Sequence, residues 1–289
     1  MRRLHSESPA WCPGCGNYSI LPALDAAIEE VGLDRRKLVL VSGIGQAAKL
    51  PHYTRANVFN GLHGRALPAA TAIKLVNHEL EVVITSGDGD MYGEGGNHFI
   101  HAIRRNIGVK CFVHNNQVYG LTKGQASPTS DLGMETPIQT HGVMSQPLNP
   151  LAIAIVEGAP FVARSTAVDR DHLQEMMVAA LKHDGGFTLL DILQPCPSFN
   201  KLNTAKWYRD RVTHIGDDHD PTDMHAALDL AMTWGDEIPI GILYHNERTP
   251  MERRHPVLAE GPLVRRYAGY TRSTGGSNEA HHTHPTRGS

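Results

Sequence analysis

Short, nearly continuous apolar runs recur along the first two-thirds of the chain. The clearest occupy residues 38–41, 82–85, 109–113, 161–164 and 187–193. Apolar runs of this length are typical of strands that are buried on both faces of a parallel sheet. Between them, apolar residues recur every three or four positions, which is the helical period. The pattern predicts an α/β fold, a parallel sheet with helices on both faces.

The helical period is clearest where Leu21, Leu24, Ile28 and Val31 recur, and this helix is expected to end near Gly32. Further helices are expected at residues 69–77, 93–106, 151–156, 171–183 and 226–234, and weaker strands at 57–60 and 238–243. In the helix at 69–77, the residues expected to be buried are Ala70, Ile73 and Val76.

These elements predict four regions. Residues 1–16 form an irregular N-terminal arm, 17–200 the α/β domain, 201–270 a C-terminal extension, and 271–289 a polar tail of disordered composition. A proline-rich loop without periodicity follows Gln125, and a loop of this length is usually functional or covers a partner surface.

Two loops follow neighbouring predicted strands and carry the strongest chemical signal. Gly87-Asp88-Gly89-Asp90 follows the run at 82–85, and a segment beginning Asn115-Asn116 follows the run at 109–113. Because the segment between them has the length of a crossover helix, both loops should lie at the carboxyl edge of the sheet. Asp88 and Asn116 would then offer oxygens to one magnesium ion carrying a phosphate ester.

Composition narrows the class of protein. The 289 residues are 40% hydrophobic and 20% charged, with a net charge of -3. This balance is that of a soluble globular protein and gives no electrostatic reason to expect nucleic acid or an anionic membrane as a partner. With no run of 18 apolar residues and no signal-peptide core, a cytoplasmic location is expected.

Three of the four cysteines are candidates for metal binding. Cys12-Pro13-Gly14-Cys15 is a turn that directs two sulfurs to one centre, and Cys196 stands between prolines after the run at 187–193. A zinc knuckle would need a second cysteine pair nearby, and a thioredoxin-like redox pair would follow a strand. Cys111 lies within an apolar run and is expected in the core.

A glycine turn after residues 38–41 resembles a dinucleotide-binding fingerprint, Gly-x-Gly-x-x-Ala. Pro51 would break the helix that carries the phosphates, and no acidic residue lies between Gln46 and His78 to hold a ribose hydroxyl. The turn is better interpreted as delivering Lys49, His52 and Tyr53 to a ligand crevice. His63 and Arg65, at a later strand-to-helix connection, are candidates on the same side.

Taken together, the motifs between about residues 10 and 215 closely resemble those of the β subunits of 2-oxoacid:ferredoxin oxidoreductases. The motifs are Cys12-Pro-Gly-Cys15-Gly16, Ser42-Gly-Ile-Gly45, Leu50-Pro-His52-Tyr53, His63-Gly-Arg65-Ala66, the Gly87-to-Asn116 spacing, Tyr119-Gly-Leu-Thr-Lys123-Gly-Gln125 and Cys196. The resemblance implies a thiamine-diphosphate-binding fold, coenzyme A as acyl acceptor, and electron transfer through an iron–sulfur cluster to ferredoxin. It also implies an α subunit, in a heterodimer or an α2β2 assembly.

The resemblance assigns roles to individual residues. Asp88, Asn116 and the backbone carbonyl of Val118 would hold magnesium, and Cys12, Cys15 and Cys196 would hold a [4Fe-4S] cluster. Lys49 would meet the substrate carboxylate and, with His63 and Arg65, forms the catalytic set. The residues expected to contact thiamine diphosphate are Gly45, His63, Gly87, Asp88, Gly89, Asp90, Asn116, Val118, Tyr119, Gly120, Leu121 and Thr122.

The glycine turn and the His-Gly-Arg segment favour 2-oxoglutarate, converted to succinyl-CoA or formed from it, over pyruvate as substrate. Competing classes are a non-redox thiamine decarboxylase, a Rossmann dehydrogenase and a zinc-binding structural subunit. One position departs from the family pattern: many relatives carry a fourth cluster cysteine where this chain has Gln46. The fourth iron would then be held by a nearby oxygen or nitrogen ligand, by solvent or by the partner; loss of the cluster is the alternative.

Overall fold

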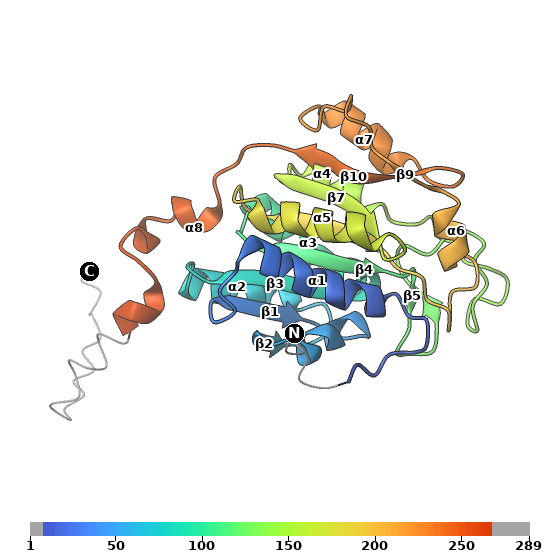
Figure 1. Cartoon of the computed structure of the whole chain (residues 1–289), viewed down its shortest axis with the longest axis horizontal. Helices are drawn as coiled ribbons and strands as arrows, with labels where there is room; N and C mark the ends of the chain where they lie inside the picture. The colour runs from blue at the N-terminus through green and yellow to red at the C-terminus, as the bar shows by residue number, and fades with distance from the viewer. Residues whose placement is uncertain (1–7, 268–289) are drawn as a thin grey trace, which may run out of the picture.

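The computed structural model describes residues 8–267 and is built on one eight-stranded sheet (Figure 1). The strand order is β2-β1-β3-β4-β8-β7-β10-β9. The bounds are β1 Leu38–Ser42, β2 Asn57–Asn60, β3 Glu81–Gly87, β4 Lys110–Asn115, β7 Phe161–Thr166, β8 Thr188–Leu193, β9 Val212–His214 and β10 Ile238–His245. All neighbours are parallel except β10 and β7, which are antiparallel. The predicted α/β fold is confirmed, with a mostly parallel sheet.

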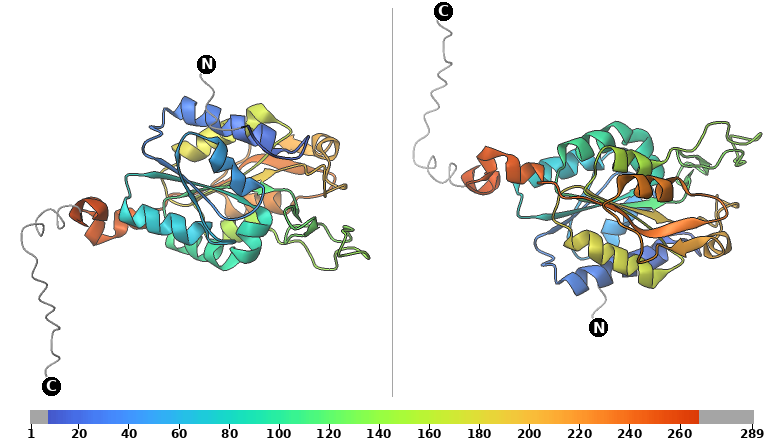
Figure 2. Two further views of the ribbon diagram at one scale, coloured as in Figure 1. Left: turned by 90° about the horizontal axis from the view of Figure 1, so that it is seen from below. Right: turned by 90° about the horizontal axis from the view of Figure 1, so that it is seen from above.

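Helices cover both faces of this sheet (Figure 2). Helices α1 (Asn17–Val31) and α5 (Arg170–Lys182) pack against each other on one face. Four helices enclose the core of the other face: α2 (Ala66–Val76), α3 (Gly96–Arg105), α4 (Pro150–Val156) and α7 (Met224–Met232). None of the helices within residues 8–267 is both long and apolar enough to cross a membrane.

Alternation along the strands divides the core into these two layers. Leu40 and Phe112 belong to the cluster under α1 and α5, whereas Val41 and Cys111 belong to the opposite cluster. All four are fully buried, which explains why the strands appear as continuous apolar runs. The prediction that Cys111 lies in the core is confirmed, and burial raises the pKa of its thiol.

The helix boundaries show where periodicity was a reliable guide. Gly32 adopts φ 72° and donates to carbonyls in the last turn of α1, so this helix ends where the sequence predicts. Helix α2 begins three residues earlier than predicted and buries Leu67 and Ala70. The prediction that Val76 is buried is wrong, because it lies about 120° around the helix from Ala70 and is 48% exposed.

The connections that bear on the site are irregular or contain only short elements. A 3-10 helix, η1 (Ala47–Tyr53), follows β1, and a π-helical turn, η2 (Gly89–Glu94), precedes α3 in the crossover from β3 to β4. A small hairpin follows β4, formed by β5 (Val118–Tyr119) and β6 (Gln125–Ala126). Residues 127–149 contain no helix or strand, as the sequence predicts for this loop.

Beyond residue 200 the chain continues the same sheet. The short helix α6 (Ala205–Arg209) leads to β9, and β10 then pairs with β7. The predicted C-terminal extension therefore supplies two strands of the main sheet before the chain leaves it through α8 (Met251–Arg254) and η3 (Pro256–Leu258). The predicted tail at 271–289 lies outside the described residues.

Candidate active site

A cavity of about 90 Å³ lies beyond the carboxyl ends of β1, β3 and β4. Its walls come from the turn before η1, the loop before α2, the start of η2 and the hairpin after β4. Every residue that the sequence predicts to contact a cofactor lines it: Gly45, His63, Gly87, Asp88, Gly89, Asp90, Asn116, Val118, Tyr119, Gly120, Leu121 and Thr122. The fold thus brings these separated segments to one edge of the sheet.

Two buried aspartates line this cavity, and Asp88 is the more deeply buried, with 1% of its surface exposed. Its Oδ2 accepts hydrogen bonds from the hydroxyls of Ser127, at 2.5 Å, and Thr129, at 2.7 Å. Burial raises the pKa of Asp88 to about 6, although these hydroxyls act in the opposite direction. The backbone of Asn116 provides a third hydrogen bond to this carboxylate. A carboxylate has about four lone-pair sites, so these three bonds still leave one site for a metal ion.

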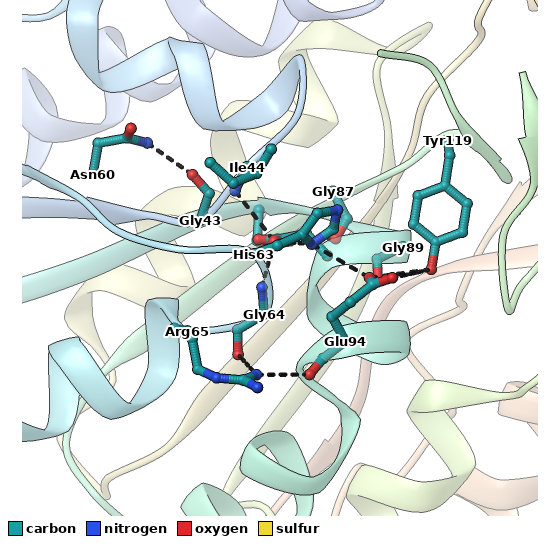
Figure 3. Close-up of polar contacts among 12 residues, drawn as sticks. Gly43, Ile44, Asn60, His63, Gly64, Arg65, Gly87, Gly89, Glu94 and Tyr119 are labelled. Atoms are coloured by element: carbon teal, nitrogen blue, oxygen red, sulfur yellow. Dashed lines mark hydrogen bonds and ion pairs between the residues drawn. The ribbon is translucent and has the colours of Figure 1, made fainter. Parts of the chain in front are cut away.

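Asp90 ties the surrounding loops together instead. Its Oδ1 accepts from the backbone N–H groups of Ile44, at 3.1 Å, and Gly64, at 2.7 Å (Figure 3). Its Oδ2 accepts from the Ser86 hydroxyl at 2.6 Å. Gly43 is required at this junction, because a Cβ there would lie 2.1 Å from Asp90 Oδ2. This carboxylate therefore fixes the glycine turn against the loop that carries His63.

His63 and Arg65 leave that loop in different directions (Figure 3). His63 lines the cavity, and its Nδ1 lies 2.8 Å from Asp90 Oδ1 and 3.3 Å from Glu94 Oε2, at ion-pair distance but not at a hydrogen-bonding angle. Arg65 does not line the cavity and donates to the Glu94 carbonyl oxygen at 3.0 Å. Tyr119, from the hairpin, donates to the Glu94 carboxylate at 3.2 Å.

Lys49, the third predicted catalytic residue, also lies outside the cavity wall. It stands in η1, and its Nζ donates to the carbonyl oxygen of Ala10 at 2.6 Å. Two further contacts hold the N-terminal arm to the same region: Trp11 Nε1 donates to the Gln46 carbonyl oxygen at 2.9 Å, and the Ala10 N–H donates to the Tyr53 hydroxyl at 3.1 Å. These contacts fix the arm in which the cysteine turn begins.

The three candidate cysteines line a second, narrow cavity: Cys12 and Cys15 from the arm and Cys196 from the loop after β8. Burial raises the pKa of the Cys15 thiol, whereas hydrogen bonds to its sulfur from the Asn17 backbone and the Gln194 side chain, at 3.3 Å, lower it. No three His, Cys, Asp or Glu side chains in residues 8–267 are gathered closely enough to hold a single metal ion.

The two cavities share part of their walls. Gln46, Asn116 and Gly120 line both of them. The amide oxygen of Asn116 accepts from the Val118 N–H at 3.1 Å, which holds the residue in place between the two cavities. The predicted cofactor residues and the predicted cluster cysteines thus line two cavities that have these three residues in common.

Several supporting residues were missed from the sequence. Tyr92 donates to the buried Asp191 Oδ2 at 2.7 Å, and Asn115 Nδ2 donates to Asp191 Oδ1 at 3.1 Å. Asp191 is 1% exposed and stands in the middle of β8. An acid inside an otherwise apolar run was the available signal. Ser127 and Thr129 gave no comparable signal, because their loop lacks periodicity.

Comparison with known families identifies the class to which this fold and site belong. Residues 43–192 match the family described as "Thiamine pyrophosphate enzyme, C-terminal TPP binding domain". The following residues, 196–260, match the family that describes the C-terminal part of the beta subunit of pyruvate ferredoxin oxidoreductase. The first match covers the whole cavity around Asp88, so this is a thiamine-diphosphate-binding domain.

Individual relatives specify the family. The chain is 47% identical over 260 residues to the 2-oxoacid:ferredoxin oxidoreductase subunit beta of Saccharolobus solfataricus, covering 86% of this chain and 85% of that one. It is 40% identical over 195 residues to the 2-oxoglutarate synthase subunit KorB of Archaeoglobus fulgidus, covering 68% and 72%. This chain belongs to the family of 2-oxoacid:ferredoxin oxidoreductase β subunits, as its motifs predict.

A solved structure agrees with this assignment. The 2-oxoglutarate:ferredoxin oxidoreductase from Magnetococcus marinus, with 2-oxoglutarate, coenzyme A and succinyl-CoA bound, superposes with a TM-score of 0.84. Sequence identity is 36%, and the superposition covers 91% of this chain and 88% of that chain. A β subunit implies an α subunit as its partner.

Proposed function

We propose that this chain, together with its α subunit, catalyses the coenzyme-A-dependent oxidative decarboxylation of 2-oxoglutarate to succinyl-CoA, with ferredoxin as electron acceptor. The reaction runs in either direction, as the potential of the ferredoxin dictates. The observation that carries the proposal is that the Asp88 cavity and the cysteine cavity share a common wall, formed by Gln46, Asn116 and Gly120. A cofactor that releases electrons singly needs an electron acceptor close by.

The choice of substrate rests on the relatives. Several are named 2-oxoglutarate enzymes, among them the KorB chains of Archaeoglobus fulgidus and Mycobacterium tuberculosis, and the Magnetococcus enzyme holds 2-oxoglutarate and succinyl-CoA. Pyruvate is the second candidate, because residues 196–260 match a family named for the pyruvate enzyme.

Magnesium fits the cavity around Asp88. Magnesium requires hard oxygen donors. Three are available here: the Asp88 carboxylate, the Asn116 amide oxygen and the Val118 carbonyl oxygen. The buried Asp88 has a raised pKa, and a divalent cation would hold it in the ionised form. Thiamine diphosphate, anchored through this ion, supplies the electron sink for decarboxylation.

The catalytic side chains have distinct tasks in this proposal. His63 lines the cavity beside Asp90 and is placed to exchange a proton with a ligand there. Lys49 has three ammonium hydrogens, of which one is engaged with Ala10, so it can still bind a substrate carboxylate. Arg65 acts through the Glu94 carbonyl and positions the His63 loop.

An iron–sulfur cluster fits the second cavity. Cys12, Cys15 and Cys196 present three soft sulfur ligands from two loops, and thiolates are the ligands that such clusters prefer. Two N–H groups already point at the Cys15 sulfur, as is usual around these clusters. We infer a [4Fe-4S] cluster here, reduced one electron at a time.

The α subunit is proposed to cover the loop at residues 127–149. This loop exposes Leu132, Ile138 and Met144, which are 55%, 66% and 82% exposed. It also lines a hollow of about 1090 Å³ that begins beside Tyr92 and Tyr119, next to the Asp88 cavity. A partner seated here would bury the apolar side chains and close the active site.

The test is an anaerobic assay of the co-purified α and β chains with a panel of 2-oxoacids. We expect ferredoxin reduction with 2-oxoglutarate that requires coenzyme A. Preference for pyruvate would select the second candidate. Decarboxylation without ferredoxin reduction would instead indicate a non-redox thiamine enzyme and contradict the proposal.

A further inference from the structure

Gln46 occupies the position between the two cavities with an oxygen that has no partner. Its Oε1 is buried and accepts no hydrogen bond from any residue of the 8–267 region. A buried acceptor that makes no hydrogen bond destabilises the folded chain. Such an atom in a functional cavity therefore indicates a group that the protein chain does not itself supply.

The backbone at this position is firmly held. The Gln46 carbonyl accepts from Trp11, the residue immediately before Cys12, and the η1 helix that follows binds the arm again through Lys49. The side chain therefore projects from a fixed point of the cysteine cavity.

Other polar groups near the cysteines are occupied or turned away. The Asn116 amide oxygen is the one assigned to magnesium in the Asp88 cavity and accepts from the Val118 N–H, and Trp11 Nε1 is a donor engaged with Gln46. Gln194 Oε1 is also buried without a partner among the described residues, but this side chain presents its Nε2 to the Cys15 sulfur and does not line the cavity. The Ser198 hydroxyl, which does line it, is a rival oxygen ligand, and Ser198→Ala therefore provides a matched control.

We propose that Gln46 Oε1 binds the fourth iron of the cluster, completing a ligand set of three thiolates and one neutral amide. This inference rests on the proposed function, in which Cys12, Cys15 and Cys196 hold a [4Fe-4S] cluster. An amide oxygen carries less negative charge than the thiolate it replaces, so the cluster potential should be higher than with four cysteines. Because Gln46 also lines the Asp88 cavity, the iron bound to Gln46 would be the cluster iron nearest to that cavity.

The test compares wild type with Gln46→Ala, Gln46→Cys and Ser198→Ala, each purified anaerobically as the complex with the α subunit. Ferricyanide removes one electron and one ferrous ion from a [4Fe-4S]²⁺ cluster and leaves [3Fe-4S]⁺. The released ion is followed with a ferrous chelator, and the product by electron paramagnetic resonance.

Release of the ferrous ion should be at least about tenfold faster in Gln46→Ala than in wild type, because removing even the groups that support a metal ligand lowers metal affinity by about that factor. It should be slower than wild type in Gln46→Cys, and unchanged in Ser198→Ala. Equal release from wild type and Gln46→Ala, or fast release from Ser198→Ala, would overturn the assignment while leaving the cluster intact. Absence of iron from the wild-type complex would instead refute the cluster and the inference together.

Discussion

Replacing Asp88 with Asn should stabilise the cofactor-free protein while abolishing cofactor binding. Asp88 is almost fully buried, and burial raises its pKa from 3.8 to about 6. Between these values the folded carboxyl keeps a proton that the unfolded chain has released, so stability falls as the pH rises through this window. Above it, the ionised group costs about 3 kcal/mol, the shift multiplied by 1.36 kcal/mol per pKa unit.

Asparagine has no charge to bury, and its amide oxygen can still accept from Ser127 and Thr129. Cofactor-free Asp88→Asn should therefore exceed wild type in unfolding free energy by up to about 3 kcal/mol above pH 6. The difference should disappear toward pH 4. Urea unfolding over a pH series measures it, with the exposed Asp217→Asn as a control that leaves the profile unchanged.

Magnesium and thiamine diphosphate should reverse the order of stabilities. Ligands that bind only the folded state add to the stability of wild type, whereas the variant lacks the metal-binding carboxylate. Identical pH profiles for the two proteins would refute the burial argument. Magnesium-dependent thiamine binding by Asp88→Asn would refute the metal role.

Three further predictions address the surroundings of the site. Gln194→Ala removes the N–H donated to the Cys15 sulfur and should make the cluster potential more negative in a redox titration, with iron content unchanged; an unaltered potential would exclude this contact. Tyr92→Phe removes a hydrogen-bond donor from the buried Asp191 and should lower the free energy of unfolding, measured in urea, by about 1.5–3 kcal/mol. The matched control Tyr119→Phe, at a half-buried site, should lower it by less than about 1 kcal/mol. Equal losses in the two variants would contradict the assigned burial. Met144→Asp should weaken association with the α subunit in gel filtration without lowering the stability of the β chain, and undiminished association would exclude this part of the loop from the interface.

The strands and the cofactor loops were predictable because local patterns determine them. Strands buried on both faces need apolar side chains at every position, and this need is visible in the sequence around Val83 and Leu190. The loop residues after β3 and β4 follow from the rule that parallel strands present their carboxyl ends to one edge. The position of the cavity around Asp88 therefore follows from local patterns in the sequence.

The partners of these residues were not predictable, because they come from distant segments. Ser127 and Thr129 reach Asp88 from an irregular loop, and Asp191 meets Tyr92 across 99 positions of sequence. Nothing in the local pattern of residues 238–243 indicated that β10 would run antiparallel to β7. The common wall formed by Gln46 likewise depends on the arm folding back onto η1, which its own sequence does not specify.

Electron transfer between the two cavities is the central claim, and freeze-quenched electron paramagnetic resonance tests it directly. The anaerobic complex of α and β chains is mixed with 2-oxoglutarate in the absence of ferredoxin, and the samples are frozen over time. We predict that the signal of a reduced [4Fe-4S] cluster appears in wild type and is absent from Asp88→Ala, which lacks the cofactor. Release of carbon dioxide by wild type without any reduced-cluster signal would contradict the account.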